Sequence, residues 1–155
     1  HGNWTWLMLK KSVLETLGVQ TRFVRVKAVG TLPVVYRIES GRIRVKADFS
    51  SLERDGLEKI FLLNEQSSLF FRKYRDSTGT VLMDEKIGVW ENVEADWASI
   101  SNKNGDVSFR LRKTQDALLY RGREFLNGSF DWIGLDYELH PAKTCFEYDI
   151  EILGS

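Results

Sequence analysis

The chain has 155 residues, of which 43% are hydrophobic and 28% are charged, and its 22 basic and 22 acidic residues cancel. This balance is typical of a globular domain and excludes a disordered tail, a low-complexity segment and a collagen-like repeat. The single cysteine, Cys145, excludes an internal disulfide and a cysteine-based zinc site. The longest apolar run, residues 6–9, is too short to cross a membrane.

We expect one domain over residues 3–153, since about 150 residues usually form one domain. The pairs His1-Gly2 and Gly154-Ser155 resemble cloning remnants, and the start shows no secretion signal. The location stays unknown at this point, with the cytoplasm preferred. Residues 3–18 predict an N-terminal amphipathic helix that packs on a sheet. Its apolar positions recur every three or four residues before Gly18, at Trp6, Leu9, Val13 and Leu17.

From residue 21 to 153 the apolar period changes to two, which predicts antiparallel β-structure. Strands are expected at residues 23–28, 34–38, 42–49, 69–74, 80–83, 89–100, 107–112, 118–125, 130–140 and 144–153. Residues 51–61 resemble a short helix, and residues 57–63 fit either a helix or a strand. The predicted fold is mainly β (α+β), a strongly curved antiparallel sheet forming a sandwich or a barrel of about nine or ten strands.

Charge is unevenly distributed along the chain. Residues 1–47 carry nine basic and two acidic residues, a net charge of +7, and the remainder carries −7. The favoured interpretation is a basic ribbon of strands beside an acidic ribbon in the same sheet, because opposite charges on neighbouring strands support pairing. The alternative is a surface that binds nucleic acid or another acidic partner.

The acidic ribbon is expected near the C-terminus. If residues 140–143 form a hairpin loop, Asp136 lies opposite Glu147, and like charges face each other. Neutralisation is then required from Arg110 and Arg112, from the basic strand at 42–46, from a cation or from a basic partner. An internal solution is favoured.

Two tryptophans are expected on polar faces of strands, whereas Trp97 is expected in the core. Trp90 shares its face with carboxylates, and Trp132 shares one with Asp136 and Glu138. An aromatic ring surrounded by hydrogen-bonding groups suits an amphipathic or sugar-like ligand. The first hypothesis is therefore a non-catalytic binding module with an aromatic-lined groove for such a ligand or for a partner protein.

Two other classes of function are weighed against this one. Single-stranded nucleic acid would bind the basic β face of residues 22–46 through Arg25, Lys27, Arg42, Arg44 and Lys46. An enzyme or a metal site would use Asp136, Glu138 and His140, which share one side of a strand. We predict no cofactor and no metal, since phosphate-binding loops and the Gly-x-Ser-x-Gly motif are absent from the sequence.

Overall fold

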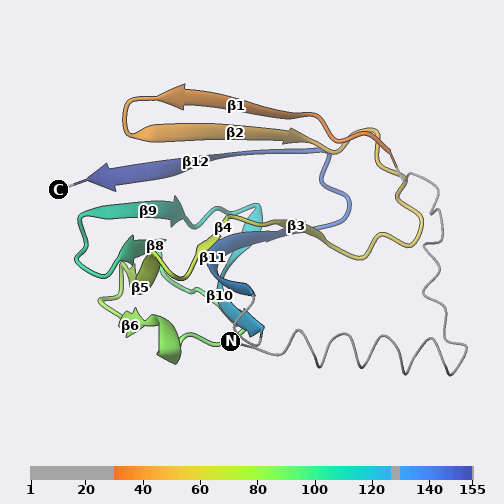
Figure 1. Cartoon of the computed structure of the whole chain (residues 1–155). Helices are drawn as coiled ribbons and strands as arrows, with labels where there is room; N and C mark the ends of the chain where they lie inside the picture. The colour runs from red at the N-terminus through yellow and green to blue at the C-terminus, as the bar shows by residue number, and fades with distance from the viewer. Residues whose placement is uncertain (1–29, 127–129, 155) are drawn as a thin grey trace, which may run out of the picture.

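The computed structural model describes residues 30–126 and 130–154, which form two antiparallel sheets (Figure 1). The larger sheet has the order β1 (Val34–Glu39), β2 (Arg42–Asp48), β12 (Cys145–Gly154), β9 (Val107–Arg112), β8 (Trp97–Asn102), β5 (Phe71–Asp76) and β6 (Val81–Met83). The smaller sheet has the order β3 (Ile60–Leu62), β11 (Phe130–Leu139), β10 (Ala117–Leu126) and β7 (Glu91–Asn92), and β4 (Glu65–Ser67) also pairs with β11. One 3-10 turn, η1 (Asp84–Lys86), follows β6.

The mainly β antiparallel prediction is confirmed, and the arrangement resembles a sandwich. The barrel alternative is wrong, because each sheet keeps two edge strands. The described ranges contain twelve strands, more than expected, since several are only two or three residues long. The predicted N-terminal helix and the strand at 23–28 lie outside the described residues.

The core lies between the two sheets and is rich in aromatic rings. Tyr137 of β11 meets Phe146 and Tyr148 of β12 at centroid distances of 5.2 and 5.0 Å. All three are buried, and the Tyr137 hydroxyl donates a hydrogen bond to the Arg112 carbonyl. Burying rings of this size supplies much of the hydrophobic stabilisation that joins the sheets.

The expected β11–β12 hairpin is wrong, because the chain crosses from one sheet to the other between these strands. A hairpin would have set the acidic positions of the two strands against each other. Instead β12 pairs with basic β2, so that Glu147, Asp149 and Glu151 lie opposite Lys46, Arg44 and Arg42. The structure confirms the favoured interpretation of basic and acidic ribbons side by side, and opposite-charge pairing explains the choice of neighbour.

Side-chain ion pairs complete this neutralisation. Arg44 lies 3.0 Å from Asp149, and Arg42 lies 3.3 Å from the same carboxylate. On the other side of β12, Glu151 lies 2.7 Å from Arg112 and 3.5 Å from Arg110. The predicted internal solution is therefore confirmed, and it uses both groups of arginines.

The strand expected at 89–100 is divided between the sheets, with β7 in the smaller and β8 in the larger. Val93 is buried as expected in the crossing segment, but Trp97 is only half-buried. The Arg110 guanidinium lies 4.2 Å above the Trp97 ring. The prediction of a core tryptophan is wrong because the crossing breaks the two-residue alternation on which it depended.

The predicted helix at 51–61 is also wrong. Residues 50–52 form a turn and a bend, residues 55–56 form a second turn, and β3 begins at Ile60. The Asp48 carboxylate accepts a hydrogen bond from the Ser50 amide, and the Arg54 guanidinium donates to the carbonyls of Phe49 and Pro141. These contacts satisfy the local polar groups without a helix.

Candidate ligand-binding site

The candidate site is built on the outer face of the smaller sheet. Ile133, Leu135 and Tyr137 of β11 are buried in the core, so the even-numbered positions of this strand face outward. With their partners on β10, they supply the outer set of Leu118, Tyr120, Gly122, Glu124, Trp132, Gly134, Asp136 and Glu138. Three of the four predicted ligand-binding residues share this face, and Trp90 reaches it from the segment before β7.

Trp90 is the centre of a three-ring cluster that lies across β11. It stacks on Tyr120 at a centroid distance of 5.1 Å, with 20° between the planes, and meets Phe61 edge-on at 5.6 Å. Tyr120 belongs to β10 and Phe61 to β3, the strands on either side of β11. Since neighbouring strands lie about 4.8 Å apart, a ring that contacts both covers β11 between them. Trp90 is 37% exposed and Phe61 43%, so aromatic surface remains open.

Asp136 lies beneath this cluster, opposite Tyr120, and is fully buried. Its Oδ1 accepts a 2.6 Å hydrogen bond from the backbone N–H of Asn64, and its Oδ2 has no hydrogen-bond partner within residues 30–126 and 130–154. Burial raises the pKa of Asp136 to about 7; the Asn64 hydrogen bond opposes this rise, and the Glu65 charge raises the pKa further. The carboxyl thus keeps one buried acceptor for an incoming N–H or O–H donor.

A gap in strand pairing fixes the position of Asp136. β11 pairs with β3 through residues 137–139 and with β4 through residues 132–134, which leaves residues 135–136 unpaired on that side. Asn64 lies in this gap, and its backbone N–H donates the hydrogen bond to Asp136. The Asn64 Oδ1 accepts a 2.9 Å hydrogen bond from the Tyr148 hydroxyl in the core. Asn64 therefore connects the candidate site to the larger sheet.

The Trp132 ring lies close to the backbone at Gly122. Gly122 and Gly134 lie opposite each other on β10 and β11, and a Cβ added at Gly122 would lie 3.1 Å from Cη2 of Trp132. The indole Nε1–H donates a 3.1 Å hydrogen bond to Glu124 Oε2. The missing side chain at Gly122 lets the ring lie close to the backbone, and the hydrogen bond fixes its edge.

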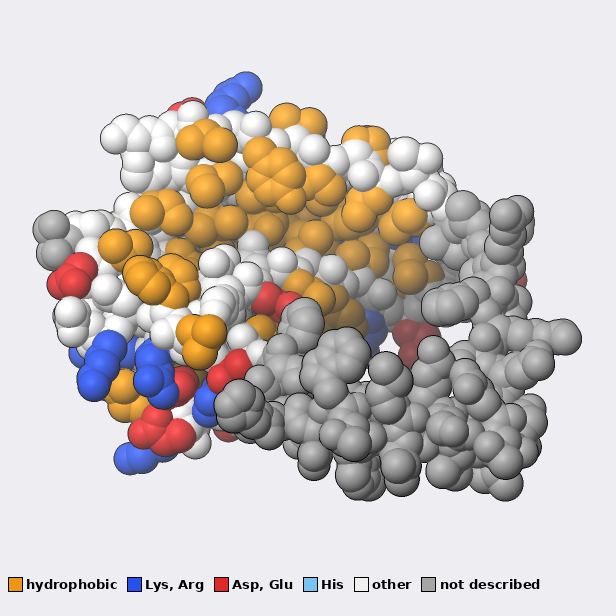
Figure 2. Space-filling view, in the orientation of Figure 1, with side chains coloured by type: hydrophobic (Ala, Val, Ile, Leu, Met, Phe, Trp, Pro, Cys, Tyr) orange, Lys and Arg blue, Asp and Glu red, His pale blue; other side chains and the backbone are white. Residues whose placement is uncertain are grey.

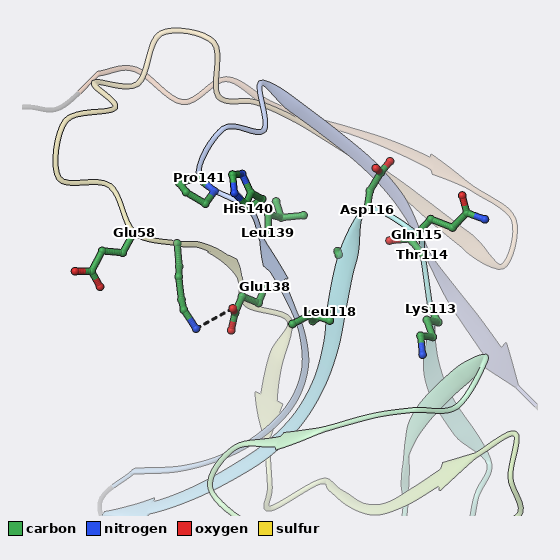
Figure 3. A pocket seen from close by; sticks show the side chains of 12 residues that line it. Glu58, Lys113, Thr114, Gln115, Asp116, Leu118, Glu138, Leu139, His140 and Pro141 are labelled. Atoms are coloured by element: carbon green, nitrogen blue, oxygen red, sulfur yellow. Dashed lines mark ion pairs between the residues drawn. The ribbon is translucent and has the colours of Figure 1, made fainter.

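A groove of about 630 Å³ adjoins the aromatic cluster. Leu118 and Glu138 line it. On the outer face Leu118 lies two residues from Tyr120 on β10, and Glu138 lies opposite Phe61. Figure 3 shows Glu138 in an ion pair inside this groove, which joins it to Lys59 Nζ at 2.8 Å. The hydrogen bond to Glu138 raises the pKa of Lys59 above its ordinary value. The groove combines apolar surface with charged hydrogen-bonding groups.

The predicted basic face is engaged within the chain. Arg42 and Arg44 pair with β12 carboxylates, and Lys46 lies opposite Glu147. Arg25 and Lys27 lie outside the described residues. These pairs give the basic ribbon an internal role, and no contact in the described part of the chain favours nucleic acid over it.

Of the three residues of the enzyme hypothesis, Glu138 and His140 line the same groove, whereas Asp136 is not among its lining residues. Asp136 is fully buried, Glu138 pairs with Lys59, and His140 Nδ1 accepts a 3.1 Å hydrogen bond from the Ala142 amide. Within the described ranges, no group of three or more His, Cys, Asp or Glu side chains is placed to hold a metal ion.

Sequence reasoning missed Phe61, Tyr120, Leu118 and Lys59. The available signal was the pairing of the segments at 118–125 and 130–140, since that hairpin register places Tyr120 opposite Asp136. No comparable signal existed for Phe61, because residues 57–63 fitted a helix as well as a strand.

The sequence matches no protein-family model, and neither a curated protein nor a solved structure matches the chain. Among the described residues, no helix is long and apolar enough to span a membrane. The described residues form a two-sheet antiparallel β-structure with an aromatic cluster on the outer face of the smaller sheet.

Proposed function

We propose that the chain is a non-catalytic binding module that holds a small amphipathic or sugar-like ligand on the outer face of its smaller sheet. The carrying observation is the partly exposed Trp90 ring, which spans Phe61 and Tyr120 above a buried carboxyl with a spare acceptor. Sugar rings present apolar C–H faces and hydroxyl edges, so they match an aromatic plane bordered by carboxylates.

Each residue has a distinct role in this proposal. Trp90 and Trp132 supply flat apolar surface, and Glu138, which is paired with Lys59, supplies an acceptor at the groove. Asp136 accepts a ligand hydroxyl through Oδ2 when Trp90 shifts to admit the ligand. A partner protein that inserts an amphipathic side chain would use the same contacts.

The test is a calorimetric and tryptophan-fluorescence titration of the full chain with soluble oligosaccharides and alkyl glycosides. We expect saturable binding that Trp90→Ala weakens at least about tenfold, as the loss of a central aromatic contact usually does. Trp97→Ala is the matched control, because Trp97 lies on the larger sheet under Arg110 and should leave binding unchanged. Equal loss in both variants, or no binding by the unmodified chain, would contradict the proposal.

A further inference from the structure

Among residues 30–126 and 130–154, nothing covers part of the inner face of the larger sheet. In the register of β1, β2 and β12, the residues on the core side include Tyr36, Ile38, Ile43, Ile150 and Ile152. Tyr36 is 64% exposed and Ile38 78%, although they follow the same alternation as buried Val45 and Ala47. We call these five residues the open face. Figure 2 shows hydrophobic side chains gathered in one broad area over the region where Figure 1 places β1, β2 and β12.

The open face continues the core rather than standing apart from it. Ile43, Ile150 and Ile152 line a cleft of about 280 Å³ together with Leu63, which lies in the link between β3 and β4 of the smaller sheet. The smaller sheet therefore ends before it covers β1 and the adjoining ends of β2 and β12. An apolar area that extends a core in this way is typical of a surface that another element covers.

We propose that the N-terminal segment, residues 5–17, docks on the open face as an amphipathic helix. In such a helix the apolar residues Trp6, Leu9, Val13 and Leu17, which recur every three or four positions, would form one stripe. A helix of 13 residues is about 20 Å long, and the six-residue β1 has about the same length. The distance from β1 to β12 is about 10 Å, or two strand spacings, which suits one helix about 10–12 Å wide.

The connection to the sheet favours this occupant. The described chain begins at Gly30, four residues before β1, so the segment is tethered to the edge strand that borders the open face. Residues 18–29 reach up to about 40 Å when extended, which allows the segment to fold back along β1. A short tether gives an effective concentration in the millimolar range, above that of a second copy at ordinary protein concentration.

The test is hydrogen exchange of the full chain, read on peptides from residues 5–17. We expect exchange at least about tenfold slower than in the isolated peptide, because the amides of a docked helix exchange only when the helix leaves the open face. Ile38→Lys should return exchange to within about twofold of the isolated peptide, since a charge would meet the apolar stripe. Val35→Lys is the matched control: Val35 is 62% exposed on the same strand but faces the opposite side.

Two further measurements complete the test. Leu9→Lys should raise the binding of a hydrophobic dye to the full chain by uncovering the open face, and the control Glu15→Lys should not. Sedimentation should show a monomer. Unprotected residues 5–17, equal effects of the two strand substitutions, or a dimer that Ile38→Lys dissociates would overturn the proposal, and the last result would assign the open face to a second copy.

Discussion

Replacing Asp136 with asparagine should change how stability depends on pH. The ordinary pKa of an aspartate, 3.8, applies to the unfolded chain, and burial raises the folded value to about 7. Well below pH 3.8 both states hold the proton, and the group adds no pH dependence to stability. Between pH 4 and 7 the unfolded chain releases the proton while the folded chain retains it, so the stability of the fold decreases as pH rises.

The size of this effect follows from the two pKa values. About three pH units separate them, and each corresponds to 1.36 kcal/mol, so the full cost above pH 7 is about 4 kcal/mol. Asparagine has nearly the same shape, keeps an oxygen for the Asn64 amide and carries no charge. Asp136→Asn should therefore match the unmodified chain at pH 4 and exceed its stability by up to about 4 kcal/mol at pH 8.

Urea unfolding of both chains at pH 4, 6 and 8 measures this difference. Subtraction removes the contribution of the other carboxylates, which both chains share. A difference that is constant across the three pH values would refute the assignment of a raised pKa to Asp136.

Two other substitutions test the packing around the site. Gly122→Ala should destabilise the fold by about 1–3 kcal/mol in thermal unfolding, since the added Cβ would lie 2.5 Å from the Val89 carbonyl oxygen. The control Gly154→Ala should have little effect in that assay, because the atom nearest to its added Cβ lies at 3.9 Å. Tyr148→Phe should cost about 1–2 kcal/mol, because it leaves the Asn64 Oδ1 without its donor. An unchanged urea midpoint for Tyr148→Phe would show that this hydrogen bond does not hold Asn64.

Alternation of apolar residues predicted most individual strands, because it records which side of a pleated strand faces the core. The segment at 42–49 shows this directly: Val45, Ala47 and Phe49 are buried as the pattern requires. The charge asymmetry also predicted the neighbours of the basic ribbon, since pairing of opposite charges is a local property of adjacent strands. These features depend on residues close in sequence or on simple complementarity.

Errors arose where the chain changes sheets. A short loop after β11 looks the same in sequence whether the next strand pairs beside it or crosses to the opposite sheet, and only the competition among all strands decides. The same ambiguity hid the crossing between β7 and β8 and turned Trp97 outward. Asp136 was correctly placed on the outer side of β11, but its burial was not predicted, and its hydrogen-bond partner Asn64 comes from a distant part of the chain.

The proposed function predicts that ligand affinity depends on pH through Asp136. A ligand hydroxyl that donates to Oδ2 interacts most strongly with the ionised carboxylate, so the pKa of Asp136 in the complex falls below its free value of about 7. The complex then binds fewer protons than the free chain. Affinity should decrease as pH falls below 7, by up to about tenfold per pH unit, and level off above it.

Calorimetry in two buffers of different ionisation enthalpy should detect release of a proton on binding near pH 6. Asp136→Asn should bind with an affinity that no longer changes over this range, whereas Glu138→Gln should retain the change, because Glu138 is already paired with Lys59. Affinity that rises on acidification would mean that the ligand meets the protonated carboxyl. The donor would then belong to Asp136, and the ligand would have to supply an acceptor in place of a hydroxyl hydrogen.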